Sequence, residues 1–427
     1  MLSESIWTDI ALPAFPTLEQ DKDCDVLIIG GGMCGLLCAH YLKEAGADCI
    51  VCEAGRIANQ TTIRTTASLS MGQDTLYSDI ARSPSHGIGD AGLYMRANRA
   101  ALDEYKKLCT SIDCDFEERD LLFEIPDTKK FKRECKTLLE IGADVSPIAG
   151  RQILRYPKQA QFHPMKLLAG IVPGLTIYEN TRILHIDGTT ATTGKHRIHA
   201  KKIIVATHFP LQKWKGLFFL KLYQKRAYVL ALEGISDPGY HYYNVDTDGV
   251  SIRMQGRFLL LCGGDHRTGK EGGGFDRLMD YRADHFPRSI VYRSWATQDT
   301  QSLDGLPYIG QITRSDSDNF VAAGFGGWGM TGSMHAALIL RELVQGRSHE
   351  LAALFDPSRS MLTGQLALNA GETLLTFLNP IPRRCTHMGC ALRWNPRECS
   401  WDCACHGSRF DKAGGILNNP AQHGFKM

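Results

Sequence analysis

The sequence lacks the features that point to a membrane or a nucleic acid. It has no uninterrupted run of about 18 apolar residues, the length that a membrane span requires. The first 20 residues carry Glu4 and Asp9 and have no basic segment ahead of an apolar core. We therefore expect no signal peptide and a cytoplasmic protein. No charge is in excess, since 48 Lys and Arg stand against 46 Asp and Glu, which argues against nucleic acid as a partner.

Repeats and low-complexity segments are also missing, so the chain is expected to be globular throughout. Its 427 residues, of which 43% are hydrophobic and 22% charged, suggest two to three domains with ordinary cores. The 42 glycines hint that backbone approaches a ligand closely. Nine of the 14 cysteines are scattered through apolar segments and are expected to be buried thiols in a reducing compartment.

A strand, a glycine turn, a helix and a second strand are predicted near the start, over residues 25–30, 33–45 and 48–53. The turn fits G-x-G-x-x-G, with glycines at Gly30, Gly32 and Gly35 and the acidic Glu53 at the end of the second strand. The glycines permit a tight turn, the approach of a pyrophosphate and close helix–strand packing, and the carboxylate accepts the ribose hydroxyls. This order predicts a dinucleotide site.

A second glycine-rich junction lies near the other end, where a strand over 319–324 runs into a helix from about Gly329 to Gln345. The amino end of that helix favours negative charge on the pyrimidine ring of a reduced flavin, so FAD is preferred over NAD. Further helices are predicted over 92–109, 128–141 and 361–378, and further strands over 176–187, 197–207, 226–233, 250–254 and 257–262.

The other five cysteines fall within residues 385–427 and form a metal-ligand pattern. Cys385 and His387 make a C-x-H pair, and Cys403 and His406 make a C-x-x-H pair, with residues 388–402 between them. Two thiolates and two imidazoles suit the [2Fe–2S] cluster of a Rieske centre. Structural zinc on the same four residues is the alternative, which the two further cysteines beside them fit poorly.

Residues 25–53, 206–210, 264–269 and 295–335 resemble the FAD-dependent D-amino-acid oxidase/glycine oxidase (DAO) superfamily. The resemblance extends over about residues 1–350, and more narrowly to the subgroup that carries a C-terminal Rieske module. It implies an α/β fold with a Rossmann-like FAD-binding domain, a mixed-sheet substrate domain and a small C-terminal β module.

The resemblance also implies where each cofactor is held. The implied FAD-binding residues are Gly30, Gly32, Gly35, Glu53, Arg56, Thr65, Thr66, Ile183, Thr207, Gly324, Gly327, Gly329, Met330 and Thr331. Cys390 and Cys405 occupy the places of the disulfide that braces the two ligand loops in the Rieske family. Ser408 is placed to donate a hydrogen bond to a cluster sulfur.

The predicted domains follow from these segments. The FAD-binding domain is assigned to 1–80, 151–210 and 291–350, and the substrate domain to 81–150 and 211–290. A helical linker over 351–384 leads into the Rieske-like module at 385–427. That module is short against a typical domain of about 100 residues, and the base sheet before the first ligand loop is expected to be missing.

The expected activity is FAD-dependent oxidation of a small amine or amino acid by hydride transfer to flavin, with electrons passed to the cluster. An electron-acceptor protein is the further expected partner. Two alternatives stay open: a redox carrier or interaction module without small-molecule turnover, and a flavoenzyme with a zinc-stapled tail.

No catalytic base is assigned from the sequence. Arg226 and Arg253 lie in predicted strands of the substrate domain and are candidates for holding a substrate carboxylate, with an ion-paired structural role as the alternative. His208 and His266 are candidate acid–base groups or structural histidines. Trp328 either packs beside the flavin or fills core.

Overall fold

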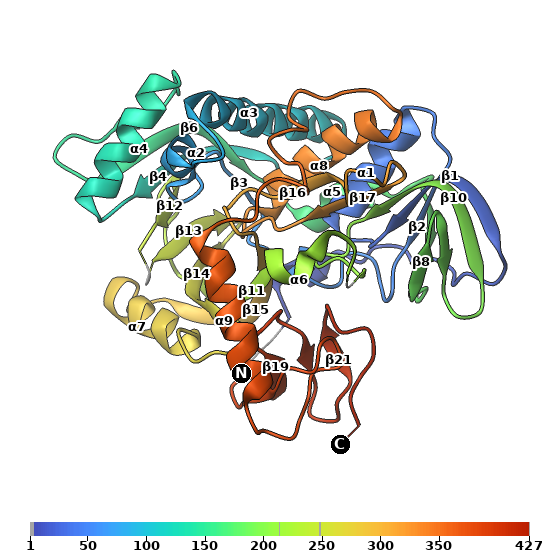
Figure 1. Ribbon diagram of the computed structural model, residues 1–427. Helices are drawn as coiled ribbons and strands as arrows, with labels where there is room; N and C mark the ends of the chain where they lie inside the picture. The colour runs from blue at the N-terminus through green and yellow to red at the C-terminus, as the bar shows by residue number, and fades with distance from the viewer. Residues whose placement is uncertain (1–3, 213, 247–248, 427) are drawn as a thin grey trace.

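The computed structural model describes residues 4–212, 214–246 and 249–426, arranged around three β-sheets. The predicted α/β class with a small C-terminal β region is confirmed (Figure 1). Of the helices in these ranges, none is long and apolar enough to cross a membrane.

The first sheet has eight strands and a largely parallel centre, in which β1 (Lys22–Ile29) pairs with β2 (Cys49–Cys52) and β10 (Arg197–Val205). Strand β1, helix α1 (Met33–Glu44) and strand β2 follow one another in the predicted strand–turn–helix–strand order. Helices α1 (Met33–Glu44), α5 (Pro164–Ile171) and α8 (Gly329–Val344) belong to the core on one face of this sheet. The strands in spatial order are β16 (Tyr308–Gln311), β17 (Asn319–Ala323), β10 (Arg197–Val205), β1 (Lys22–Ile29), β2 (Cys49–Cys52) and β7 (Thr176–Tyr178), with β8 (His185–Asp187) and β9 (Thr190–Thr192) paired beside β10.

The second sheet is mixed and has nine strands. In spatial order these are β15 (Ile290–Gln301), β11 (Tyr223–Glu233), β14 (Phe258–Arg267), β13 (Val250–Gln255), β12 (Tyr240–Asn244), β4 (Glu117–Glu124), β6 (Ile153–Gln161) and β3 (Ser68–Leu69), with β5 (Ser146–Pro147) beside β6. Strands β3, β6 and β15 come from segments that the sequence assigns to the FAD-binding domain. The second sheet therefore draws on both predicted domains.

Helices cover this sheet toward the outside of the molecule (Figure 1). They are α2 (Leu76–Arg82), α3 (Ile88–Ser111), α4 (Thr128–Glu140) and α7 (Phe275–His285). Helix α6 (Phe218–Lys221) lies nearer the middle of the molecule, and its Phe218 packs with the first sheet (Figure 1). Three short 3₁₀ turns complete this part, at η1 (Ile6–Asp9), η2 (Thr62–Arg64) and η3 (Lys215–Leu217).

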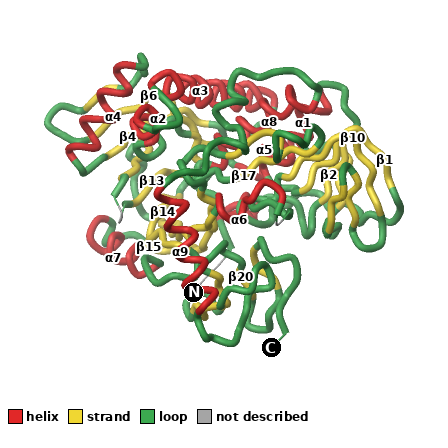
Figure 2. The backbone as a smooth tube through the Cα atoms, in the orientation of Figure 1, coloured by secondary structure: helices red, strands yellow, loops and turns green. Residues whose placement is uncertain are grey.

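The C-terminal tail is a small sheet that follows helix α9 (Gly364–Leu378) and consists mostly of loop (Figure 2). Its strands are β18 (Leu392–Asn395), β19 (Ser400–Cys403), β20 (Arg409–Phe410) and β21 (Ile416–Asn418). All four follow Cys385, and in the described part of the tail no strand lies between α9 and that cysteine. Among its described residues, the short module therefore lacks strands ahead of its first ligand loop.

The glycine turn depends on Gly35, which sits in the first turn of α1 against the end of β1. A Cβ atom built on Gly35 would lie 1.9 Å from the backbone oxygen of Gly30, so any side chain must push the helix off the strand. We expect Gly35→Ala to lower the free energy of unfolding by about 2 kcal/mol or more, because overpacking against backbone is not relieved by a rotamer change.

Chemical denaturation measures this effect, and Gly371→Ala is the matched control. Gly371 lies inside α9, and a Cβ built on it has nothing within 4 Å. Alanine there should raise stability by up to about 1 kcal/mol through its helix propensity. Equal effects of the two substitutions would contradict the packing role of Gly35.

Candidate functional site: a dinucleotide cavity joined to a metal-ligand tail

A cavity of about 760 Å³ lies between the first two sheets and reaches the tail. The predicted FAD residues that line it are Gly30, Gly32, Glu53, Arg56, Thr65, Thr66, Ile183, Thr207, Gly327, Gly329 and Met330. The remaining three lie outside its described lining. Gly35 packs α1 on β1, Gly324 turns with a φ of +78°, and Thr331 is buried in α8.

The glycine turn presents an open backbone to this cavity. Gly30 has a φ of +111°, and a Cβ atom on it would lie 2.5 Å from the oxygen of Ala206, so glycine is required there. At Gly32 the nearest atom to a built Cβ is Thr62 Oγ1 at 3.4 Å. Because α1 begins directly after this glycine, its amino end faces the cavity as a pyrophosphate site requires.

The acidic residue of the motif is held in place by backbone. Glu53 Oε2 accepts a hydrogen bond from Gly31 N at 2.8 Å, and Oε1 accepts one from Gly55 N at 2.9 Å. Each carboxylate oxygen keeps a second lone pair for a ribose hydroxyl. Arg56 is less free than the sequence suggests, because its Nη1 donates to the buried Glu179 at 2.9 Å.

Thr62 is a residue that the sequence reasoning missed. Its Oγ1 accepts a hydrogen bond from Met33 N at 3.0 Å and so satisfies an amide in the first turn of α1. The only sequence signal is the Thr-rich segment that follows the second strand.

The four predicted metal ligands of the tail are buried together. Cys385, His387, Cys403 and His406 are at most 5% exposed, and the two imidazole rings lie 4.9 Å apart between centroids. A hydrogen bond to the Cys403 thiol, against the opposing effect of burial, lowers the pKa of Cys385 to about 7. The same hydrogen bond and burial raise the pKa of the Cys403 thiol, so the pair favours one thiolate, the form that binds metal, at Cys385.

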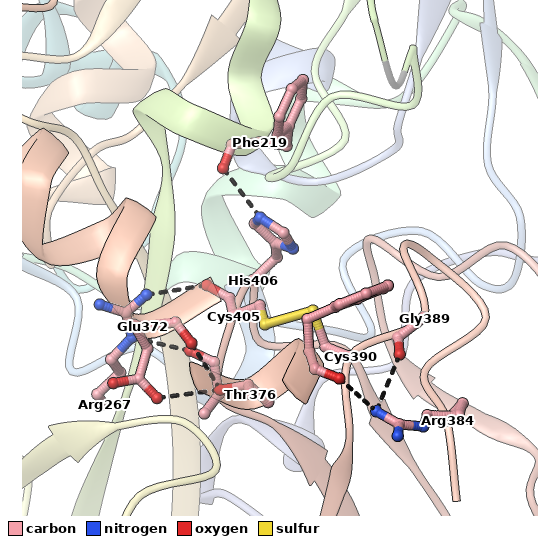
Figure 3. The surroundings of a disulfide bond; sticks show 11 residues. Phe219, Arg267, Glu372, Thr376, Arg384, Gly389, Cys390, Cys405 and His406 are labelled. Carbon is pink, nitrogen blue, oxygen red and sulfur yellow. Dashed lines mark hydrogen bonds between the residues drawn. A yellow bond between two sulfur atoms is a disulfide. The ribbon is translucent and has the colours of Figure 1, made fainter. Parts of the chain in front are cut away.

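His406 is already oriented for a ligand. Its Nε2 donates to the backbone oxygen of Phe219 at 2.9 Å, while its Nδ1 is buried and has no hydrogen-bond partner among the described residues (Figure 3). A ring held through one nitrogen presents the other to a metal. Cys390 and Cys405 form a disulfide between the two ligand loops, with the Cys403 sulfur within 4.8 Å of both of their sulfurs. These donors fit an iron–sulfur cluster.

The flavoprotein body supports the second ligand loop directly. Gln224 Nε2 donates to His406 O at 2.7 Å, and Gln298 Nε2 donates to Gly407 O at 2.8 Å. Arg267 donates to the backbone oxygens of Ala404 and Cys405. Strands β11, β14 and β15 thus hold the backbone of this loop through side-chain hydrogen bonds.

A buried ion network connects the same strands to the tail. Glu398 accepts hydrogen bonds from Arg226 Nε at 3.0 Å, from Arg409 Nη2 at 2.8 Å and from Tyr228 OH at 3.2 Å. The side chains of Arg226, Glu398 and Arg409 are 4%, 3% and 6% exposed. Although burial opposes ionisation, the two guanidinium groups lower the pKa of the Glu398 carboxyl below its usual value.

This arrangement settles several of the guesses from sequence. Arg226 is paired with Glu398 and does not bind a substrate carboxylate. His266 hydrogen-bonds Tyr228 on the same side, 2.9 Å from its hydroxyl, and lies outside the described cavity lining. Arg253 and Trp328 do line the cavity. His208 lines it too, and burial lowers its pKa to about 4, so the ring is neutral at pH 7 and not poised as an acid–base group there.

Comparison with known proteins agrees with these two parts. Residues 25–343 match the family described as FAD dependent oxidoreductase (DAO). The chain belongs to this family. Residues 378–427 match the Rieske [2Fe–2S] domain, so the cofactors are FAD and a [2Fe–2S] cluster.

Relatives of this FAD-dependent oxidoreductase include a protein named for its Rieske cluster and proteins named as an oxidoreductase or an oxidase. It is 30% identical to the putative Rieske 2Fe-2S iron-sulfur protein YhfW of Bacillus subtilis, over 98% of this chain and 96% of that protein. It is 23% identical to gamma-glutamylputrescine oxidoreductase of Escherichia coli, over 79% and 88% of the two chains. Glycine oxidase from Geobacillus kaustophilus shares the fold with a TM-score of 0.65 at 18% identity, over 80% of this chain and 100% of that one.

The ion network predicts how firmly the tail is attached. Glu398→Gln leaves Arg226 and Arg409 buried with one counter-charge fewer, at an expected cost of about 3 kcal/mol or more. Heating the variant should therefore release the cluster at a lower temperature, followed by the loss of its visible absorption.

Glu271→Gln is the matched control, because Glu271 pairs with Arg393 across the same two parts of the molecule but is 85% exposed. An exposed pair contributes at most about 1 kcal/mol. If both variants lost the cluster at the same temperature, the buried network would not be what holds the tail.

Proposed function

We propose that this FAD-dependent oxidoreductase oxidises a small amine or amino acid and passes the electrons through its [2Fe–2S] cluster to a separate one-electron acceptor protein. When bound, FAD supplies two-electron oxidation at carbon and the cluster supplies one-electron transfer. The C–H and N–H bonds of the substrate give up two electrons and two protons, which leaves an imine. Water then hydrolyses the imine to a carbonyl compound and ammonia or an amine.

The observation that carries the proposal is the segment Ala206–Phe209, which lies between the two cofactor sites. Ala206, Thr207 and His208 line the cavity. The ring of the next residue, Phe209, lies 5.9 Å from that of His387 and 6.1 Å from that of His406. One peptide link, from His208 to Phe209, and one ring-to-ring contact thus separate the cavity wall from each ligand histidine.

The tail is bonded to this segment as well as packed on it. The Asn419 side-chain amide donates to the backbone oxygens of Thr207 and Phe209, and Gln422 Nε2 donates to Leu211 O at 3.0 Å. Asn419 and Gln422 also line the cavity. A tail that helps to enclose the dinucleotide site supports transfer within one chain over a role for the tail as a separate module.

The names of the relatives support the substrate class. Gamma-glutamylputrescine oxidoreductase, glycine oxidase and an L-proline dehydrogenase from P. horikoshii are named for compounds that carry C–N bonds. The DAO family fold is common to this chain and the last two.

Removing the cluster tests the proposal. We expect Cys403→Ser to lose iron yet keep FAD, and to let an amine reduce the flavin anaerobically at the wild-type rate. Reduction of a one-electron acceptor such as ferricenium should fall about tenfold or more, because the one-electron carrier is gone. Stopped-flow absorption and metal analysis give these quantities.

Cys399→Ser is the control, since Cys399 is an exposed free thiol four residues before Cys403. It should behave as wild type in every assay. Unchanged acceptor reduction in Cys403→Ser would contradict the proposed route, and zinc in place of iron in the wild-type protein would support the zinc-stapled alternative. Failure of every amine and amino acid to reduce the flavin would support the carrier alternative.

A further inference from the structure

One wall of the cavity, on the second sheet, gathers three carboxyl groups from distant parts of the chain. They are Asp74 after β3, Asp265 on β14 and Asp299 on β15, and all three line the cavity. None is closed off from the cavity, because Asp74 and Asp265 are exposed and Asp299 is partly exposed. This wall is distinct from the glycine turn, which belongs to the first sheet.

Strand register brings these groups together. Asp299 pairs with Lys225 across β15 and β11, so the two side chains stand next to each other on one face. Asp265 lies on β14, on the opposite side of β11, beside the bulge between Arg226 and Tyr228. Asp265 and Asp299 thus share this wall with the ammonium group of Lys225, which also acts on Asp74 in the loop after β3.

The electrostatic consequence is an excess of negative charge. Although solvent reaches both groups, the protein around the cavity desolvates them. This desolvation raises the pKa of Asp265 to about 6, with Asp74 as a further cause, and raises that of Asp299 to about 7, with Asp265 as a further cause. Lys225 acts in the opposite direction on both Asp74 and Asp265. Arg226, which is paired with Glu398, acts in the opposite direction on Asp299. Arg253 also lines the cavity but lies opposite Leu260 of β14, five residues from Asp265. At pH 8 the three carboxylates therefore outnumber the ammonium group of Lys225 beside them.

Aromatic rings stand beside the carboxylates. The Tyr243 hydroxyl donates to Asp74 Oδ1 at 3.0 Å, and the Tyr243 ring lies 5.3 Å from the ring of Trp328. Both rings line the cavity. Carboxylates next to the faces of tyrosine and tryptophan form the environment that attracts an organic cation.

The buried hydroxyl of Thr297, close to Asp299 in the chain, has no hydrogen-bond partner among the described residues. Thr297 lies two residues before Asp299 on β15, so its side chain points to the same face. It is 7% exposed and lines the cavity, and in the described ranges its Oγ1 has no hydrogen-bond partner. A buried hydroxyl without a partner is costly unless a ligand supplies one.

We propose that this wall binds a positively charged alkylammonium group of the substrate, through Asp74, Asp265 and Asp299 with the Tyr243 and Trp328 rings. This proposal rests on the proposed function and makes its substrate class more specific. The substrate is then a cationic amine, and it is not recognised through a carboxylate. The ammonium N–H groups would donate to the carboxylates and to Thr297 Oγ1.

Binding to the FAD-loaded protein at pH 8 tests this without turnover. The probes are 1,4-diaminobutane, the neutral 1,4-butanediol and the dianion succinate, titrated anaerobically and followed by calorimetry and by the absorption of the flavin. We expect saturable binding of the diamine alone. Asp265→Asn and Asp299→Asn should each weaken it about tenfold, because each removes one charge-assisted contact.

Asp284→Asn, an exposed carboxyl on α7, is the matched control and should bind as wild type. Both cavity variants are isosteric and should retain FAD, which the flavin spectrum checks. Equal diamine binding in all variants, no diamine binding, or preferential binding of succinate would overturn the proposal. Binding without flavin reduction by any amine would leave this site standing and count against the proposed function. Turnover of an amine at an unchanged rate in both Asp265→Asn and Asp299→Asn would leave the proposed function standing and count against this site.

Discussion

The buried carboxylate of Glu398 is the interaction on which the arrangement of the two cofactor sites depends. A charge at this depth is tolerated only when it is paired and fully hydrogen-bonded. Arg226 from the flavoprotein and Arg409 from the tail meet that requirement jointly, and Tyr228 adds a further donor. Separating the two parts would break both hydrogen bonds between Arg226 and Glu398. The tail is therefore a fixed part of the flavoprotein, and it is not a mobile appendage.

The described part of the tail has no strands ahead of its first ligand loop, and the larger domain supports the second ligand loop directly. Strands β11, β14 and β15 of the second sheet provide Gln224, Arg267 and Gln298, which hold the backbone of the second ligand loop. A small sheet that ends at the ligand loops can then be sufficient, because its support comes from the larger domain. One face of the second sheet thus serves the cluster and the other serves the cavity.

Local patterns in the sequence were enough for the parts of the fold that repeat a known motif. The G-x-G-x-x-G turn, its flanking strands and the C-x-H and C-x-x-H pairs each lie within a short segment, so spacing alone indicates their chemistry. Arg226 could not be interpreted in this way, because its partner Glu398 is 172 residues away. The same holds for Asp265 and Asp299, which the register of β11, β14 and β15 brings to one wall, and for Asp74, which follows β3 and accepts a hydrogen bond from Tyr243 of β12.

If the tail is fixed to the flavoprotein, electron transfer from the flavin to the cluster occurs within one molecule. Flash reduction of the flavin in the holoprotein tests this. A light pulse in the presence of a photochemical donor reduces the flavin, and the visible absorption of the cluster is then followed at several protein concentrations. The account predicts that the cluster becomes reduced after the flavin at a rate that does not change with concentration. A rate proportional to protein concentration, or a cluster that stays oxidised while the flavin is reduced, would contradict it.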